Sequence, residues 1–174
     1  MRRLILLRHS KAVPHTGRDD YERALTEGGR QDAERIGQFI ARKGLIPDLA
    51  IYSSAERTRE TAKIVEESWP RRVKSLAENG LYEATRETIL AWVRRLPDKA
   101  AVAMIVGHNP GVADLANLLV DGGAEDDRLR MAGKFPTSAF AVIDIPVEKW
   151  ADVEPRTGRL VRFTAPSDLA LKRA

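Results

Sequence analysis

Three short segments carry residue types from which a phosphoryl-transfer site could be built. Arg8-His9-Ser10 follows one apolar run, Ser53-Ser54-Ala55-Glu56-Arg57 follows a second, and Gly107-His108-Asn109-Pro110 follows a third. A neutral imidazole nitrogen is a competent nucleophile near neutral pH. An arginine guanidinium presents forked donors that match the oxygens of a phosphate group. Two histidines and two arginines therefore predict attack by one histidine on a phosphoryl group.

The chemistry also suggests how the work is divided among these side chains. Phosphoryl transfer needs neutralisation of the equatorial oxygens and a nucleophile placed in line. One histidine can attack while the two arginines and the second histidine, preferably protonated, hold the charge. No magnesium is needed if arginines supply the positive charge. A helix opening at Asn109-Pro110 would add its N-terminal dipole at the same place.

The segments that precede these side chains have the pattern of buried strands. Short apolar runs predict strands at 4–7, 49–52, 73–77 and 102–106. Between them, helical spacing and cap residues predict helices that start after Thr26, after Ser53 or Ser54, after Thr85 and at Pro110, with Gly122-Gly123 ending the last. Such alternation is typical of a parallel sheet covered on both faces, where ligands bind beyond the carboxyl ends of the strands.

The C-terminal third has a different pattern. Residues 139–145 and 159–164 read as two strands, and the segment between them does not require a helix, so the two strands can pair antiparallel. The predicted fold class is therefore α/β: a three-layer α/β/α sandwich with a mainly parallel central sheet and a partly antiparallel C-terminal edge. We expect one domain spanning residues 1–174.

Composition narrows the function further. The 174 residues include no cysteine, which excludes a disulfide framework, a thiolate zinc site and a cysteine nucleophile. The net charge is +4, but basic and acidic residues are interleaved, so we expect no nucleic-acid partner. No apolar stretch is long enough for a membrane span. We expect a cytoplasmic monomer without metal or cofactor.

The motifs resemble those of the histidine phosphatase superfamily. The resemblance rests on Arg8-His9 after the first strand, on the spacing of Ser53, Arg57 and Thr61, and on Gly107-His108-Asn109-Pro110. Its small protein-phosphohistidine phosphatase branch, the SixA type, is also similar at Arg8-His9-Ser10-Lys11-Ala12, Leu25-Thr26-Glu27-x-Gly29, Leu81-Tyr82-Glu83 and Phe135-Pro136-Thr137-Ser138-Ala139. The resemblance covers residues 4–145 and implies a mainly parallel sheet between helices and no metal.

The resemblance implies that His9 is the nucleophile and becomes phosphohistidine, while Arg8, Arg57 and His108 bind the phosphoryl group. Ser10 stands where the superfamily commonly has glycine, and its hydroxyl either donates to phosphate or caps the loop. Asn109 is a further candidate phosphate ligand. Larger members carry a glutamate acid, and the candidate here is Glu83, whose alternative role is an ion pair with Arg86.

The sequence gives little indication of a general acid, and this affects which substrate we expect. An alkoxide leaving group needs a proton from the enzyme, whereas the nitrogen of a phosphoramidate takes its proton readily near neutral pH. We therefore expect a phosphohistidine phosphatase acting on a phosphorylated protein. The alternatives are a small-molecule phosphomonoesterase of the same fold, acting on a phosphorylated metabolite, and a non-catalytic phosphate-binding module.

Overall fold

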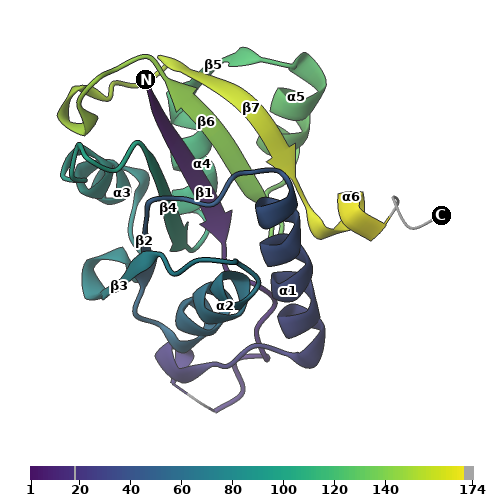
Figure 1. The fold of residues 1–174 in the computed structure, drawn as a ribbon. Coiled ribbons are helices and arrows are strands. Elements are labelled where there is room, and N and C mark those ends of the chain that lie inside the picture. Colours follow the sequence, from purple (N-terminus) through teal and green to yellow (C-terminus); the bar gives the residue numbers. More distant parts are fainter. Residues whose placement is uncertain (18, 171–174) are drawn as a thin grey trace.

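A computed structural model describes residues 1–17 and 19–170 and is built on one seven-stranded sheet. The strands are β1 (Arg2–Arg8), β2 (Leu49–Ser53), β3 (Lys74–Glu78), β4 (Val102–Gly107), β5 (Val120–Gly123), β6 (Phe140–Ile145) and β7 (Gly158–Thr164). Their order across the sheet is β3-β2-β4-β1-β6-β7-β5 (Figure 1). Strand β1 therefore lies in the middle of the sheet, with β4 on one side and β6 on the other.

Strand directions confirm a mainly parallel sheet with an antiparallel C-terminal part. Strands β1, β2, β3 and β4 are parallel to their neighbours in this group, and β5 is parallel to β7. Strand β6 is antiparallel both to β1 and to β7. The predicted antiparallel pairing of the last two strands is thus confirmed. Strand β6 runs opposite to the strands on both of its sides.

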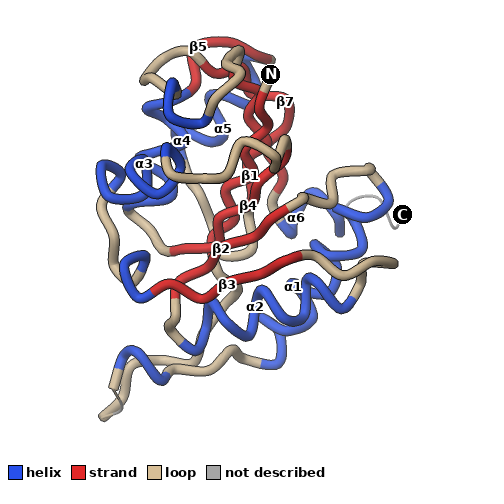
Figure 2. The backbone as a smooth tube through the Cα atoms, turned by 60° about the vertical axis from the view of Figure 1, so that its left-hand side comes forward, coloured by secondary structure: helices blue, strands red, loops and turns tan. Residues whose placement is uncertain are grey.

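Helices cover both faces of the sheet (Figure 2). The α-helices are α1 (Glu27–Arg42), α2 (Glu56–Glu67), α3 (Arg86–Arg94), α4 (Gly111–Leu119), α5 (Glu125–Gly133) and α6 (Pro166–Ala170). The 3-10 helices are η1 (Asp20–Glu22), η2 (Asn79–Leu81) and η3 (Trp150–Asp152). Helices α1, α2 and α6 contribute to one core, and α3, α4 and α5 to the other. This is the predicted three-layer arrangement.

Strand β1 shows how the sequence separates the two cores. Leu4 and Leu6 belong to the core beneath α3 and α4, whereas Ile5 and Leu7 belong to the core beneath α1 and α2. All four side chains are fully buried. Because strand side chains alternate between faces, a continuous apolar run is the pattern required by a strand with helices on both sides. Each such side chain contributes roughly 1.5–3 kcal/mol by its burial.

The predicted starts of two helices, α2 and α4, need correction. The side chain of Thr26 caps α1 and that of Thr85 caps α3, as expected. Neither Ser53 nor Ser54 caps α2, which begins after Ala55 with no side-chain cap. Helix α4 begins at Gly111 after Pro110, so Asn109 is not its cap. Its side-chain amide is instead drawn to another segment, where it donates to the carbonyl of Phe135 at 2.8 Å.

The segment after α4 also differs from the prediction. Gly122 and Gly123 do not end that helix, because α4 ends at Leu119 and the two glycines belong to strand β5. Gly123 has a positive φ of 114°, and a Cβ there would lie 2.3 Å from the carbonyl oxygen of Leu160 on β7. Glycine is thus required here by close approach of two strands rather than by a helix end.

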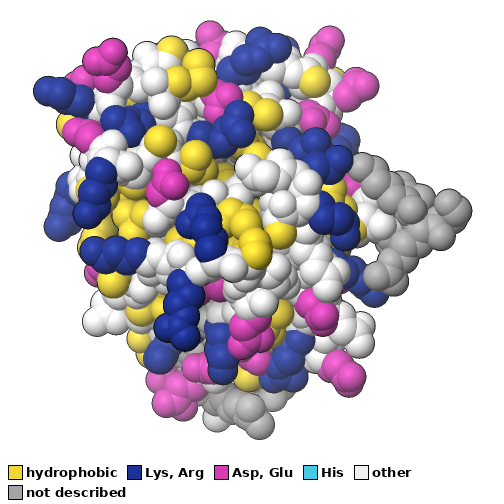
Figure 3. Space-filling model, in the orientation of Figure 1, with side chains coloured by type: hydrophobic (Ala, Val, Ile, Leu, Met, Phe, Trp, Pro, Cys, Tyr) yellow, Lys and Arg dark blue, Asp and Glu magenta, His cyan; other side chains and the backbone are white. Residues whose placement is uncertain are grey.

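Charges of both signs are interspersed over the face shown in Figure 3, as the interleaved sequence predicts. Within the described residues, no helix is long and apolar enough to cross a membrane.

Candidate active site

Three neighbouring parallel strands deliver the predicted catalytic segments to one edge of the sheet. Strands β2, β4 and β1 are adjacent and point the same way. Their carboxyl ends therefore bring together Ser53, His108 and His9. The backbone N–H of His9 donates to the carbonyl of Gly107 at 3.0 Å, which joins two of the three segments directly. The imidazole rings of His9 and His108 lie 5.3 Å apart between centroids.

A cavity of about 400 Å³ opens at this edge. Its lining residues are Arg8, His9, Lys11, Ala12, Asp20, Arg23, Arg57, Glu83, His108, Asn109 and Thr137. Every site residue predicted from the sequence except Ser10 is in this set. The cavity gathers several positive side chains and few negative ones, so it suits an anionic ligand.

The hydrogen bond of the His9 ring selects its reactive nitrogen. Nδ1 of His9 lies 2.7 Å from the carbonyl oxygen of Ser10. A carbonyl oxygen can only accept, so Nδ1 carries the proton and Nε2 keeps its lone pair. Burial lowers the pKa of His9 to about 4, and the charges of Arg57 and Arg8 act in the same direction. His9 is therefore neutral at neutral pH, which is the protonation state that a nucleophile needs.

The second histidine is held through its other nitrogen. Nε2 of His108 lies 2.7 Å from the hydroxyl of Ser53, which accepts from the N–H of Ala55 at 3.3 Å. The hydroxyl keeps a second lone pair, so it can either accept from Nε2 or donate to it; when it donates, the proton of the neutral ring lies on Nδ1. Nδ1 is buried and has no partner among the described residues. In the tautomer with the proton on Nδ1, this atom can donate to a bound oxygen.

We expected His108 to be protonated, but its surroundings in the protein favour the neutral ring. Burial, followed by the charges of Arg57 and His9, lowers the pKa of His108 to about 3. The ring is therefore a neutral hydrogen-bond donor at neutral pH. A phosphoryl dianion bound beside it would favour the charged form and raise this pKa, because an opposite charge stabilises the imidazolium.

Each of the two arginines donates hydrogen bonds from terminal nitrogens of its guanidinium, while its Nε has no partner among the described residues. Arg8 donates from a terminal nitrogen to the carbonyl of Phe135 at 3.0 Å. Arg57 is only 4% exposed, and both of its terminal nitrogens donate to Asp20. The Nε atoms of both arginines are buried and have no partner among the described residues. These donors fit the oxygens of a phosphoryl group lying between the two side chains.

The depressed histidine pKa values predict a specific pH dependence of stability. Between about pH 6.5 and pH 5, histidines in the unfolded chain become protonated, whereas buried His9 and His108 stay neutral in the folded protein. The unfolded state then binds more protons, so the free energy of unfolding should fall as pH falls through this range. Urea unfolding at several pH values measures it. A double His9→Asn, His108→Asn variant should lose most of this slope, and an unchanged slope would contradict the assignment.

Ser10 lies beneath the cavity rather than in its wall. It is fully buried, and its hydroxyl oxygen lies 2.5 Å from that of Ser138, which precedes β6. Its backbone N–H donates to the hydroxyl of Thr61 at 3.0 Å. The hydroxyl that could donate to phosphate is thus engaged with Ser138. Of the two roles considered for Ser10, this geometry fits the structural one, since it ties the nucleophile loop to β6 and α2.

Glu83 and Asn109 both line the cavity. Glu83 is exposed and has a left-handed backbone, with φ of 52°, a conformation uncommon for this residue type. The alternative ion pair with Arg86 is not formed, because Arg86 pairs with Glu87 at 2.9 Å. Asn109 uses one N–H of its amide on Phe135 and retains the other. Both residues remain candidates on position alone.

Sequence reasoning missed an acidic residue beside the arginines. Asp20 accepts hydrogen bonds from Arg57, from the hydroxyl of Tyr82 at 2.6 Å and from Arg23 at 2.9 Å. It lies in the polar loop between the first strand and Leu25. The local signal was the Asp20-Tyr21-Glu22-Arg23 segment just before Leu25-Thr26, which carries charge but does not indicate a contact with Arg57.

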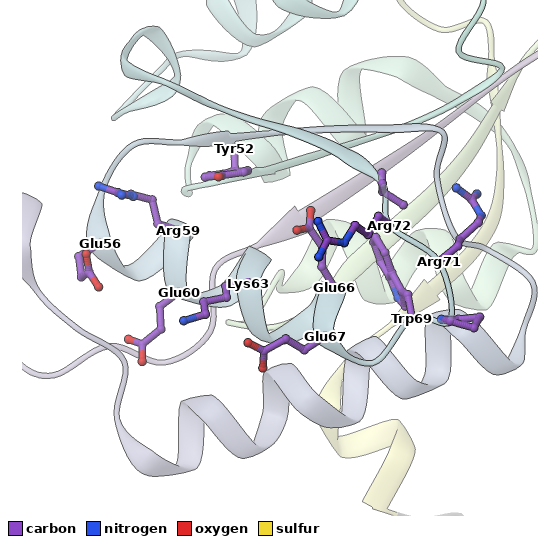
Figure 4. A pocket seen from close by; sticks show the side chains of 12 residues that line it. Tyr52, Glu56, Arg59, Glu60, Lys63, Glu66, Glu67, Trp69, Arg71 and Arg72 are labelled. Atoms are coloured by element: carbon purple, nitrogen blue, oxygen red, sulfur yellow. The ribbon is translucent and has the colours of Figure 1, made fainter.

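A larger cavity of about 860 Å³ lies along α2 and the loop before β3 (Figure 4). Charged side chains of both signs, such as Glu56, Arg59, Lys63 and Glu67, line much of it, and no histidine does. It contains none of the predicted catalytic residues. The smaller cavity is therefore the candidate active site, because both candidate histidines and both candidate arginines line it.

The protein has an α/β fold, and its candidate site places two histidines and two arginines around one cavity. In the described ranges 1–17 and 19–170, no cluster of three or more histidine and acidic side chains is placed to hold a metal ion. A family model for branch 1 of the histidine phosphatase superfamily matches residues 4–108. The chain belongs to this superfamily.

Known proteins are similar to this chain in sequence and structure over almost its whole length. An uncharacterised protein of Mycobacterium tuberculosis is 32% identical over 162 residues, spanning 92% of this chain and 99% of its own. A solved structure from Agrobacterium tumefaciens, provisionally described as the phosphohistidine phosphatase SixA, is 30% identical with a TM-score of 0.80, covering 95% of this chain and 98% of its own. One from Nakamurella multipartitia with the same provisional description is 26% identical, with a TM-score of 0.82, and covers 95% and 96%.

Proposed function

We propose that this protein is a phosphatase that removes the phosphoryl group from phosphohistidine on a partner protein through a phosphohistidine intermediate on His9. The single observation that carries the proposal is the arrangement of His9. Its Nε2 keeps a lone pair, because Nδ1 donates to the carbonyl of Ser10, and the ring lies beside His108, Arg8 and Arg57.

The reaction has two steps. In the first, the Nε2 lone pair attacks phosphorus while the bond between phosphorus and the substrate nitrogen breaks, and that nitrogen takes a proton from solvent. The arginines and His108 hold the equatorial oxygens. In the second, water attacks phosphorus and gives up a proton to solvent, the electron pair of the broken bond returns to Nε2, and inorganic phosphate leaves. His9 returns to its starting form without a metal.

The leaving group favours phosphohistidine as the substrate. An imidazole nitrogen accepts a proton readily near neutral pH, so its departure does not depend on a strong internal acid. Among the described residues that line the cavity, neither carboxyl group is a buried acid. Glu83 is exposed. Asp20 is held ionised, because the hydrogen bond from Tyr82 is the main cause that lowers its pKa to about 2. The SixA descriptions of two similar structures support the same substrate class.

A specific observation keeps a second candidate open. Glu83 lines the cavity with a left-handed backbone, and a carboxyl group there could protonate an alkoxide leaving group. This would suit a phosphomonoesterase acting on a small phosphorylated metabolite.

The two candidates differ in their expected substrate selectivity. We expect kcat/KM for a phosphohistidine protein to exceed that for simple alkyl phosphates by at least about 100-fold, a ratio within the usual contribution of general acid catalysis. A panel of phosphohistidine proteins, sugar phosphates and phosphoamino acids measures this. Comparable turnover of an alkyl phosphate and a phosphohistidine protein would contradict the proposal.

A Glu83→Gln variant tests the role of the carboxyl group in the same panel. Under the leading proposal, its hydrolysis of a phosphohistidine protein stays within about threefold of wild type, because the leaving imidazole needs no acid. Glu87→Gln is the matched control, since Glu87 is an exposed carboxylate of α3 that does not line the cavity. A loss of about 100-fold or more in the turnover of alkyl phosphates by Glu83→Gln, without such a loss in Glu87→Gln, would support the phosphomonoesterase.

A further inference from the structure

Asp20 engages the phosphate-binding arginine at two places. Its backbone carbonyl accepts from one terminal nitrogen of Arg57 at 2.8 Å, and its carboxylate accepts from the other at 3.1 Å. The arginine side chain is 95% buried, whereas that of Asp20 is 28% exposed at the cavity wall. A short 3-10 helix, η1, therefore fixes the guanidinium of a residue on α2.

The carboxylate of Asp20 is itself held from two further sides. Tyr82 donates its hydroxyl hydrogen to the oxygen that Arg57 also contacts, and Arg23 donates to the other oxygen. The ring of Tyr82 packs against the His108 ring at 5.6 Å and lies 5.9 Å from the guanidinium carbon of Arg57. One aromatic side chain thus touches the acid, the arginine and the second histidine.

This network uses two of the five N–H donors of the Arg57 guanidinium. Both terminal nitrogens are engaged by Asp20, and the buried Nε is the atom without a partner among the described residues. An arginine side chain is long and rotamer-rich, so anchoring two of its nitrogens restricts how the third can point. Positioning a charged group before the substrate arrives is what gives such a group its effect in phosphoryl transfer.

We propose that Asp20 is a positioning residue that orients Arg57 toward the phosphoryl group, and that Tyr82 acts through Asp20. The proposal rests on the proposed function, because it assumes that Arg57 binds phosphate. A carboxylate near a phosphate also repels it, so removal of Asp20 could in principle strengthen anion binding. We expect the loss of orientation to outweigh the relief of repulsion.

The experiment measures binding of inorganic phosphate to the full chain by ³¹P NMR titration, together with kcat and KM for hydrolysis. We expect Asp20→Ala to weaken phosphate binding about tenfold, the loss that corresponds to about 1.4 kcal/mol. Asp20→Asn keeps a side-chain oxygen acceptor, and we expect a weakening of only about threefold, a partial rescue. Glu22→Gln is the matched control, since it removes one charge from the same 3-10 helix at an exposed position that does not line the cavity.

Tyr82→Phe isolates the hydroxyl, because the ring and its packing remain. We expect about a threefold loss of phosphate affinity in wild type and no further loss when it is added to Asp20→Ala, because a residue that acts through Asp20 has no effect without it. Additive losses would overturn that part of the proposal. Thermal unfolding of each variant shows that the chain is folded, and the isosteric Asp20→Asn carries the test if Asp20→Ala is not.

Two outcomes would overturn the role of Asp20 and leave the proposed function standing. One is unchanged phosphate affinity in both Asp20 variants. The other is tighter binding in both, which would make Asp20 a shield against anions. Failure of wild type to bind phosphate and to hydrolyse any phosphorylated substrate would overturn the proposed function, and this proposal with it.

Discussion

Replacement of His9 by alanine is expected to slow hydrolysis of a phosphohistidine substrate by about 10⁴-fold or more, the scale on which loss of a nucleophile acts in other enzymes. Nε2 of His9 is the atom that we propose to form the covalent intermediate, because the hydrogen bond from Nδ1 to the carbonyl of Ser10 leaves the lone pair of Nε2 available. Steady-state kinetics with a phosphorylated protein measures the loss, and phosphate binding should survive it, because Arg8, Arg57 and His108 remain.

The matched control for this variant is His15→Ala. His15 is an exposed histidine from the loop after β1, and it does not line the cavity. We expect wild-type turnover from it. Residual turnover in His9→Ala within about tenfold of wild type would refute covalent catalysis by His9. Wild-type protein with no turnover on any phosphodonor would instead favour the binding-module alternative.

Replacement of Arg57 is expected to have the second largest effect. Arginines that neutralise the transferred phosphoryl group contribute on the order of 10³–10⁵ to kcat in other phosphoryl-transfer enzymes. We expect a loss of about 10³-fold in kcat/KM for Arg57→Ala, with much of it in kcat, because the charge on the oxygens changes during transfer. Arg57→Lys should recover only part, since an ammonium lacks the planar fork.

Two observations separate this effect from a loss of stability. Arg59→Ala removes the same charge from an exposed position of the same helix, and we expect its activity to stay near that of wild type. Removal of Arg57 also leaves the carboxylate of Asp20 without one of its partners, so thermal unfolding of the variant must be measured alongside its kinetics. A folded Arg57→Ala protein with wild-type kcat/KM would refute the proposed role.

The central part of the fold was predictable because its signal is local. The run Leu4–Leu7 is apolar without interruption, and such a strand needs helices on both faces, which is what the alternating pattern supplies. Parallel strands place their carboxyl ends at one edge of the sheet, so the sequence alone predicts that Arg8, His9 and His108 lie close together.

The C-terminal elements were less predictable, because their patterns are weak or long-range. Strand β5 contains Gly122 and Gly123, which usually indicate a helix end, and it is a strand only because it pairs with β7. Helix α5 was missed because Met131 is its single buried residue, so it shows little amphipathic pattern. Pairing partners far along the chain decide both cases.

Long-range contacts also explain what was missed in the site. Asp20 reaches Arg57 across 37 positions and Tyr82 across 62, and nothing in the composition of the loop indicates either partner. Ser10 could not be assigned between two roles because Ser138, which engages its hydroxyl, lies 128 positions away. The neutral state of His108 depends on burial and on Arg57, which only the folded arrangement provides.

The most direct test of the central claim is mass spectrometry of protein trapped during turnover. The wild-type chain is mixed with a phosphohistidine protein and quenched within the first turnover, at alkaline pH to preserve phosphoramidates, and the modified peptide is then sequenced. We predict one phosphoryl group per chain, carried by His9, labile in acid and absent from His9→Ala. A phosphoryl group on any other residue would contradict the claim, as would full turnover with no labelled chain at any quench time.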